Sequence, residues 1–340
     1  MKPPAWGLPL LKTQVVELDL KTLYAPVKND LADVEANFKS LADFWKRDFP
    51  DLHDMLRHIL MGGKILRPAL TFMSGRCIDG KTGRILDMAT ANELMHIATL
   101  VHDDAIDRAD TRRGRVTVNK LWGTEKAILL GDFLFARAGE FAASTDNLRV
   151  TKLFSQTLGI IAIGELRQAR DLYSPAQNME GYLQRIAGKT AALLKMSAES
   201  GAILAGGTED QVQILTGYGY NLGLAFQIVD DILDFIGTEK ELGKPVGSDL
   251  RQGTVTLPAL ILMERQPKSN PVAQFLAGKD REKNIGLAIE QIKSGGIIEE
   301  CYLEAEKYSE KAIELLAGLP ESTCREALKA LAVYLVRRRN

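Results

Sequence analysis

Two short acidic motifs with the same spacing constrain this chain more than any other feature. The first follows the apolar run MATANELMHIATLV and consists of Asp103, Asp104 and Asp107. The second ends another apolar run and consists of Asp230, Asp231 and Asp234. Residues three and four apart share one face of a helix, so each motif gathers its carboxylates on one side. Their repulsion costs about 0.2–0.5 kcal/mol per pair, which predicts a compensating partner outside the helix.

A hard cation is the partner that this arrangement favours. Mg2+ takes carboxylate oxygens, keeps several waters and commonly shares the phosphate oxygens of a substrate. One acidic motif alone is more often a solvated helix face, but a second copy with the same spacing makes that explanation poor. The pair therefore predicts Mg2+ as cofactor.

The placement of proline predicts an all-α fold. A proline inside a helix costs about 3 kcal/mol. None occurs between Pro68 and Pro175, or between Pro175 and Pro245. Both stretches carry apolar residues at helical spacing without sustained strand alternation. We predict helices at about 12–22, 28–47, 51–61, 64–77, 82–108, 124–144, 148–172, 178–205, 208–236, 253–264, 281–294, 297–317 and 320–338.

The organisation of the chain favours one domain. A length of 340 residues exceeds the usual size of a single core and by itself suggests two domains. However, no linker rich in Pro, Gly or Ser divides the chain, and the two acidic motifs must converge to share a site. We therefore predict one large helical bundle around a central cavity over residues 1–340, with an N-terminal arm of about 1–27.

Composition narrows the location and the partners. The net charge of −1 gives no indication of a nucleic-acid partner. The three cysteines are far apart and lack CxxC or His neighbours, which argues against a disulfide framework or a zinc site and favours the cytoplasm. No run approaches 18 apolar residues, so we expect no membrane span. The first residues, MKPPAWGLPLLKTQ, are broken by prolines and lack a signal cleavage site.

Together with four further stretches, the motifs resemble the trans-isoprenyl diphosphate (polyprenyl) synthase family, medium- or long-chain type. The matching stretches are GGKILRP at 62–68, HIATLVHDDAID with RRG from 96 to 114, GKT at 188–190, FQIVDDILD at 226–234 and GKPVGSD at 243–249. This family joins isopentenyl diphosphate to an allylic diphosphate, by ionising the allylic C–O bond and removing a proton after addition. The resemblance therefore implies a Mg2+-dependent prenyltransferase with the isoprenoid synthase fold.

The resemblance also implies roles for individual residues. The Mg2+ ligands that bridge to the allylic diphosphate would be Asp103, Asp107 and Asp230. Direct or water-mediated support would come from Asp104, Asp231 and Asp234. Positive charge around the same diphosphate would come from Arg112, Lys189 and Lys244. The isopentenyl diphosphate pocket, which needs cations without metal, would use Lys64, Arg67, His96 and Arg113.

Three residues match positions along the reaction path, namely Lys189, Thr190 and Gln227. A hydroxyl or amide oxygen there can face a carbocation without quenching it. No side chain is an evident general base, and the released pyrophosphate can take the proton. Two positions depart from the family pattern: Ile65 stands where an arginine is common, and Thr254 where a lysine is common. These departures bear on substrate affinity.

Product length follows from the residues that precede Asp103. Short-chain members tend to place an aromatic residue four or five positions earlier, where this chain has Thr99 and Ala98. A helix turn rises about 5.4 Å, comparable to one isoprene unit, so small residues there admit a longer tail. The next candidates for the floor are Met95 and Leu94. We predict a product longer than C20, in a range of about C25 to C40.

The predicted helices from 124 to 172 bear on assembly. They carry apolar residues on more than one face, which requires burial on several sides: Ile128, Leu129, Phe133, Leu134 and Phe135. The resemblance supplies a second copy as the partner, in a homodimer. Peripheral membrane contact through the lipophilic product is compatible with this picture.

Four alternatives remain open from the sequence. A short-chain synthase would make C15 or C20. A class I terpene cyclase also uses an aspartate-rich helix and Mg2+, but its second motif normally has an Asn/Ser/Glu pattern. A non-catalytic subunit of a two-component synthase usually loses the aspartates, which are all present here. The last alternative is a purely structural helical protein. The primer, the exact product, the pathway and the need for a second subunit stay undecided.

Overall fold

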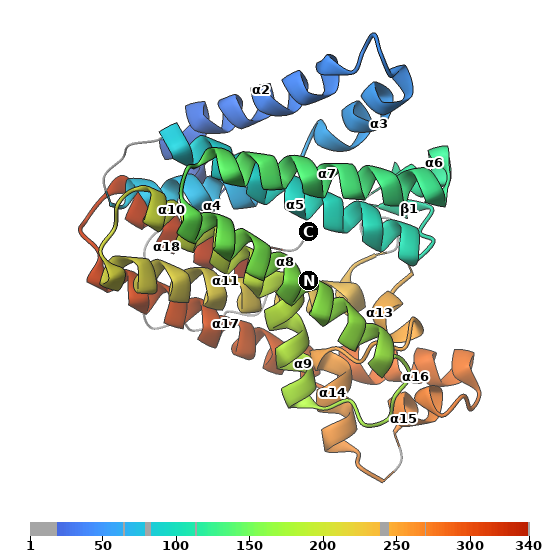
Figure 1. Ribbon diagram of the computed structural model, residues 1–340. Helices are drawn as coiled ribbons and strands as arrows, with labels where there is room; N and C mark the ends of the chain where they lie inside the picture. The colour runs from blue at the N-terminus through green and yellow to red at the C-terminus, as the bar shows by residue number, and fades with distance from the viewer. Residues whose placement is uncertain are drawn as a thin grey trace.

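The computed structural model describes residues 19–63, 65–78, 83–112, 114–238, 245–268 and 270–338. These residues form helices and one short hairpin (Figure 1). The hairpin pairs β1 (Thr111–Arg112) with β2 (Arg115–Val116) in antiparallel register. The all-α prediction is therefore confirmed.

The elements of the first half are α1 (Leu20–Leu23), η1 (Ala25–Val27), α2 (Lys28–Phe44), α3 (Pro50–Leu60), α4 (Leu66–Arg76), α5 (Gly83–Ile106), α6 (Val118–Trp122), α7 (Thr124–Ser144) and α8 (Leu148–Asp171). Those of the second half are α9 (Met179–Ile186), η2 (Ala187–Ala191), α10 (Ala192–Leu204), α11 (Glu209–Ile236), α13 (Ser248–Arg251), α14 (Leu257–Arg265), α15 (Pro271–Leu276), α16 (Arg281–Ser294), α17 (Ile297–Leu315), η3 (Leu316–Gly318) and α18 (Thr323–Arg337).

The helix α5, which carries the first acidic motif, packs along α7 (Figure 1). The two run antiparallel, since Arg84 lies 3.7 Å from Asp146 at one end and His102 lies 2.9 Å from the Ile128 carbonyl at the other. A side chain at Gly131 would collide with the His102 ring, so this glycine allows the close approach. The packing fixes the end of α5 that bears the aspartates.

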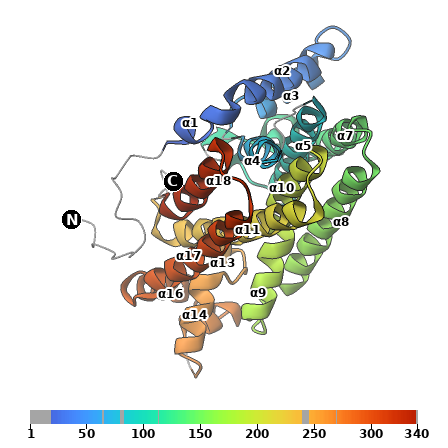
Figure 2. The ribbon, with the colours of Figure 1, turned by 90° about the vertical axis from the view of Figure 1, so that its left-hand side faces the viewer.

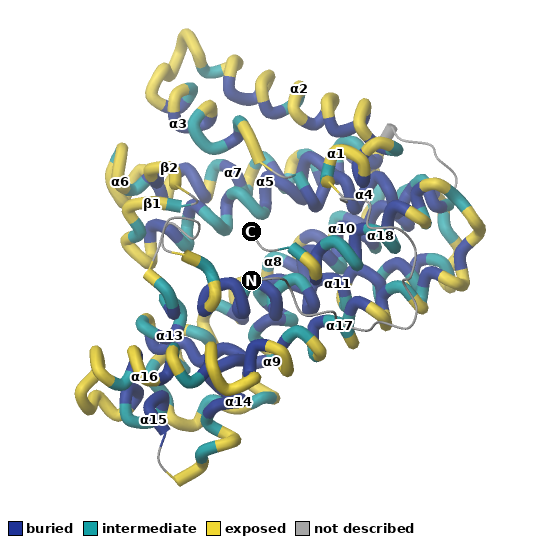
Figure 3. The backbone as a smooth tube through the Cα atoms, turned by 180° about the vertical axis from the view of Figure 1, so that it is seen from behind, coloured by how far each residue is buried: buried dark blue, intermediate teal, exposed yellow. Residues whose placement is uncertain are grey.

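The helix α11, which carries the second motif, links two clusters of buried apolar side chains. Its first half belongs to a core with α2, α4, α5, α7, α10 and α18. Its second half belongs to a core with α9 and the helices from α13 to α17. Figure 3 shows buried residues running along α4, α10 and α11, while the outer sides of α2 and α16 are exposed. The second motif therefore lies deep in packed structure.

Two long helices begin with side-chain caps. The Thr208 hydroxyl accepts from the Gln211 N–H, and the Gln211 side chain returns a bond to the Thr208 N–H, which is a capping box. Ser322 caps α18 by accepting from the Arg325 N–H. Each cap satisfies a backbone donor that the first helical turn leaves without a partner.

Other boundaries differ from the prediction. The helix expected at 253–264 begins at Leu257, because Pro258 tolerates only a helix start and Gly253 has φ of +87°. The helix expected at 178–205 contains a π-helical turn, η2, between α9 and α10. The hairpin and the short helices α6, α13 and α15 were not predicted. Of the helix expected at 12–22, residues 12–18 lie outside the described residues.

Among the described residues, no helix combines the length and the apolar character needed to cross a bilayer.

Candidate active site

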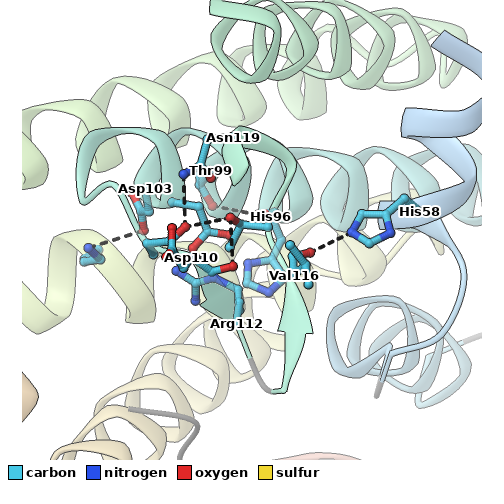
Figure 4. A network of polar contacts seen from close by, with 12 residues as sticks. His58, His96, Thr99, Asp103, Asp110, Arg112, Val116 and Asn119 are labelled. Atoms are coloured by element: carbon cyan, nitrogen blue, oxygen red, sulfur yellow. Dashed lines mark hydrogen bonds and ion pairs between the residues drawn. The ribbon is translucent and has the colours of Figure 1, made fainter. Parts of the chain in front are cut away.

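The first acidic motif lies at the C-terminal end of α5 and is only partly covered. Asp104 is buried, Asp103 is half-buried and Asp107 is exposed. Arg112, on β1, donates from Nε to Asp104 Oδ1 at 2.7 Å. Figure 4 shows Asp103, His96 and Thr99 along α5, with Arg112 and Val116 on the adjoining hairpin. Two carboxylates of this motif therefore remain accessible to a ligand.

The second motif lies inside α11 and is largely enclosed. Asp231 and Asp234 are each 2% exposed, whereas the Asp230 side chain keeps 38% of its surface. Asp231 accepts hydrogen bonds from Tyr182 Oη and Gln227 Nε2, each at 2.8 Å. Asp234 accepts from the Asp249 N–H at 3.2 Å. Within this motif, Asp230 is the most accessible carboxylate.

The π-helical turn η2 connects the two motifs. Its Lys189 Nζ lies 3.4 Å from Asp103 Oδ2, so it contacts the first motif. The next residue, Thr190, donates from Oγ1 to Gln227 Oε1 at 2.5 Å, and Gln227 in turn bonds to Asp231. Single π-helical turns within α-helices occur often at functional sites. Two neighbouring residues of one turn thus connect to the two motifs, Lys189 to the first and Thr190, through Gln227, to the second.

The turn η2 packs between α11 and α8, and a glycine on α11 allows the tighter of the two contacts. A Cβ at Gly223 on α11 would lie 2.5 Å from the Ala191 Cα, so only glycine permits this approach. On the opposite side, Gly188 packs against Gly164 on α8, with a contact of 3.8 Å from the Gly188 Cβ position to the Gly164 Cα. The two contacts bring Lys189 toward α5 and Thr190 toward α11.

The carboxylates of the first motif carry more negative charge than the nearby cations neutralise, which favours the binding of a further cation. Burial raises the pKa of Asp104, and the charges of Asp103 and Asp107 add to this against the effect of Arg112. The pKa of Asp107 is also raised, first because the surrounding protein removes part of the hydration of this otherwise exposed carboxylate, and then by the charge of Asp103. Burial opposes the charged form of Lys189, but Asp103 and Glu165 outweigh it and raise the pKa of its ammonium. An added positive charge would stabilise these carboxylates.

An added positive charge would also stabilise the carboxylates of the second motif. The pKa of Asp231 is raised to about 8, first by burial and then by the charge of Asp249, against the hydrogen bonds from Gln227 and Tyr182. Asp249, on α13, also raises the pKa of Asp107. Its carboxylate is therefore close enough to both motifs to act on each.

The residues expected to bind isopentenyl diphosphate are only partly described. Arg67 lies on α4 and is buried, with 8% of its surface exposed, rather than on a solvated face. His96 is half-buried on α5, and its carbonyl accepts from Thr99 Oγ1 at 2.7 Å. Lys64, Arg113 and Lys244 lie outside the described residues. Their predicted roles stay predictions.

The proposed determinants of product length lie along α5. Ala98, Met95 and Leu94 are fully buried, and Thr99 is half-buried. On α7, the Phe135 ring packs edge-on against His102, with the ring centroids 5.5 Å apart. Phe133 instead faces Trp45, at 6.0 Å. Phe135 is therefore the aromatic residue placed against α5.

The sequence alone did not single out four residues that contact the acidic motifs or Lys189. Glu165, on α8, pairs with Lys189 at 2.7 Å. Arg338 donates to Asp230 Oδ1 at 2.5 Å and stacks over the Phe226 ring at 3.9 Å. Tyr182 and Asp249 contact Asp231 and Asp234, as described above. Only Asp249 carried a signal, since it closes the GKPVGSD stretch; the others are distant in sequence.

The donor set fits Mg2+ bound jointly with a diphosphate. The accessible groups, Asp103, Asp107 and Asp230, offer hard carboxylate oxygens. Among the described residues, no three acidic, histidine or cysteine side chains form a ready metal cage. Mg2+ does not require one, because it is usually held by one or two carboxylates, waters and substrate phosphates.

Comparison with known proteins identifies the family of the chain. Residues 49–292 match the family model described as polyprenyl synthetase. The chain belongs to the polyprenyl synthetase family. It is 38% identical to heptaprenyl diphosphate synthase component 2 of Geobacillus stearothermophilus, over 94% of this chain and 99% of that protein. This membership makes it a trans-polyprenyl diphosphate synthase, a prenyltransferase.

Solved structures of the family share its fold. A decaprenyl diphosphate synthase from Rhodobacter capsulatus superposes with a TM-score of 0.87 at 34% identity, covering 95% of this chain and all (100%) of that chain. A polyprenyl synthase from Caulobacter crescentus, complexed with calcium and isoprenyl diphosphate, gives 0.88 at 33% identity, covering 95% and 98%. The isoprenoid synthase fold predicted from the sequence is confirmed.

Proposed function

We propose that this prenyl synthase uses Mg2+ to condense isopentenyl diphosphate with allylic diphosphates into an all-trans product longer than C20. The observation that carries the proposal is η2, whose adjacent residues Lys189 and Thr190 contact Asp103 of one motif and the Gln227–Asp231 pair of the other. A substrate held there meets acids on one side and neutral oxygens on the other. The whole chain is treated as one domain with an N-terminal arm, because α11 is shared by both cores.

Each group has a distinct task in this proposal. Bound Mg2+ supplies the positive charge that makes pyrophosphate a leaving group. Asp103, Asp107 and Asp230 would hold it, and Lys189, which pairs with Asp103 and Glu165, would add positive charge beside the diphosphate. Thr190 and Gln227 present neutral oxygens toward the allylic carbon as positive charge develops there, which is stabilisation by preorganised dipoles.

The product length rests on the course of α5. The growing tail would leave Asp103, pass Thr99 and Ala98, and meet Met95 and Leu94 after about two turns, or roughly 11 Å. Phe135 from α7 would border the same path. The relatives named for heptaprenyl and decaprenyl products support a length in the medium to long range.

The direct test is incubation of the purified protein with Mg2+, isopentenyl diphosphate and each short allylic diphosphate, followed by chain-length analysis. We expect products longer than C20, in a range of about C25 to C40, and no turnover after chelation of the metal. Ala98→Phe should shorten the product to about C15 or C20 while early condensations continue, because the ring blocks one helix turn. A wild-type enzyme that stops at C15 would contradict the proposed path.

A homodimer is part of the proposal. Apolar side chains on the outer faces of α7 and α8 are exposed in the single chain: Ile128, Leu129, Ile160, Ile163 and Leu166. The two helices lie side by side at one edge of the molecule (Figure 2). A second copy would cover them. The component 2 name of one relative makes a different second subunit the alternative.

Sedimentation distinguishes these assemblies. A homodimer gives about twice the 37.4 kDa mass of one chain and needs no other protein for turnover. A monomer at micromolar concentration would contradict the homodimer. A cytoplasmic location completes the proposal, supported by three buried, unpaired cysteines.

A further inference from the structure

A chain of three hydrogen bonds runs from α9 through α11 to η2 and ends beside the first acidic motif. Tyr182 Oη donates to Asp231 Oδ2 at 2.8 Å. Gln227 Nε2 donates to Asp231 Oδ1 at 2.8 Å. Thr190 Oγ1 donates to Gln227 Oε1 at 2.5 Å. Tyr182 is 49 positions from Asp231 in the sequence and is 1% exposed, so the contact is internal to the fold.

The geometry shows the direction of each bond. Both Asp231 oxygens are acceptors, one from the Tyr182 hydroxyl and one from the Gln227 NH2 group, so the Gln227 amide turns its NH2 group toward Asp231. Its carbonyl oxygen then faces Thr190, whose hydroxyl proton is used in that bond. The remaining lone pairs of both oxygens are therefore the groups left to face outward. A reversed amide would present hydrogens instead, which would repel a developing positive charge.

Tyr182 holds the far end of this chain in place. Its phenol occupies one Asp231 oxygen, which leaves the other aligned with Gln227, one helical turn earlier on α11. The ring itself is packed beneath the Arg185 guanidinium, 5.5 Å from the ring centroid, and Arg185 donates to the Val255 carbonyl at 2.6 Å. The anchor thus rests on α9 and the segment before α14, not on the first motif.

We propose that Tyr182 is a positioning residue for prenyl transfer, acting through Asp231 to fix the Gln227 amide so that Gln227 and Thr190 turn oxygen atoms toward the allylic cation. This inference rests on the proposed function, since it assigns the two oxygens to that cation. It gives Asp231 an internal role, as the acceptor that sets an amide, in addition to its place in an acidic motif. Tyr182 touches neither substrate nor metal.

The test compares two tyrosines that lose the same group. Tyr182→Phe removes the donor to Asp231. Tyr218→Phe is the matched control, because Tyr218 is also fully buried and its hydroxyl donates to the Leu328 carbonyl at 2.7 Å, away from the motifs. Both variants should lose similar thermal stability. Only Y182F should lose turnover, by about tenfold in kcat, equivalent to about 1.4 kcal/mol in the barrier.

The kinetic pattern separates positioning from general damage. For Y182F, the KM of both substrates and the Mg2+ concentration for half-maximal rate should stay within about twofold of wild type, since diphosphate binding uses other groups. In a Gln227→Ala background, Tyr182→Phe should cost no further kcat, because the residue through which it acts is absent. Independent effects that multiply would overturn the proposal.

A second pair of substitutions guards against misfolding. Tyr182 replaced by 4-aminophenylalanine keeps a hydrogen-bond donor, while 4-methylphenylalanine fills similar volume without one. The amino variant should restore most of the kcat and the methyl variant should not. Equal rates in both, or unchanged kcat in Y182F beside an active wild type, would overturn this inference alone. A wild-type protein without prenyl transfer would overturn the proposed function and this inference with it.

Discussion

The two acidic motifs have the same spacing but opposite surroundings. The first ends α5 beside a hairpin and keeps Asp103 half-buried and Asp107 exposed. The second lies within α11 and encloses Asp231 and Asp234 at 2% exposure. The motif on α5 therefore leaves two carboxylates accessible to a ligand. The motif on α11 leaves one, Asp230, and holds the other two in the packed interior. Sequence spacing places the acids on one face, but burial decides which of them can reach a ligand.

The largest expected effect comes from the accessible carboxylates on both sides. Asp103→Ala and Asp230→Ala should each lower kcat by a factor of about 100 or more, because preorganised charge at the leaving group is lost. Helicity should be unchanged, since neither side chain supports the core. Steady-state rates with circular dichroism measure this, and Asp51→Ala, which breaks only an exposed pair with Lys126, is the control. Near-normal turnover in both variants would reject the assignment.

The second motif should contribute more to the stability of the fold than the first. Asp234→Ala removes a buried carboxylate and leaves the partly buried Asp249 N–H without this acceptor, which costs about 1–3 kcal/mol of unfolding free energy. Asp107→Ala acts at an exposed helix end and should stay within about 0.5 kcal/mol. Urea unfolding of both variants gives the comparison. Equal losses of unfolding free energy in the two variants would mean that the buried second motif does not stabilise the fold more than the first.

The close contact between η2 and α11 should be required for both stability and turnover. Gly223→Ala places a methyl group 2.5 Å from the Ala191 Cα, so η2 must shift, at a cost of about 1–3 kcal/mol, and the Thr190–Gln227 bond is disturbed. Turnover should fall along with stability. Gly286→Ala on α16 is the matched control, because its methyl group meets nothing within 4 Å and alanine favours the helix. If G223A is as stable and as active as G286A, η2 does not depend on this close contact.

The smallest effect concerns Arg338, which pairs with Asp230. A cation that binds Asp230 competes with this guanidinium for the carboxylate. Arg338→Met should therefore lower the Mg2+ concentration for half-maximal rate by roughly two- to fivefold, the size expected for a partly screened ion pair. Metal titration of the rate checks it. An unchanged or higher Mg2+ requirement would show that the pair does not compete with the metal.

Much of the fold was predictable because helical periodicity and proline placement are local signals. The long helices, the capping box at Thr208 and the Ser322 cap all follow from neighbouring residues. The start of α14 was wrong by four residues, because Pro258 was placed inside a helix that can only begin near it. The position of the π-helical turn η2 depends on the close approach of Gly223 on α11 to Ala191, which no local pattern reveals.

The candidate site shows the same division. Its motif residues were identified from spacing and resemblance, but their partners were not. In the sequence, nothing marks Tyr182 or Arg338 as a functional residue. Tyr182 bonds to Asp231, 49 positions away, and Arg338 bonds to Asp230, 108 positions away. Glu165 has no motif that links it to Lys189. Such contacts are made by tertiary packing, so only the structure assigns them.

The difference between the motifs can be tested most directly by locating the metal. A crystal structure with Mn2+ and a non-reactive allylic diphosphate analogue gives anomalous peaks at each cation. We predict peaks bound by Asp103, Asp107 and Asp230, with Asp231 still hydrogen-bonded to Tyr182 and Gln227. A peak bound directly by Asp231, with Tyr182 displaced, would contradict the account.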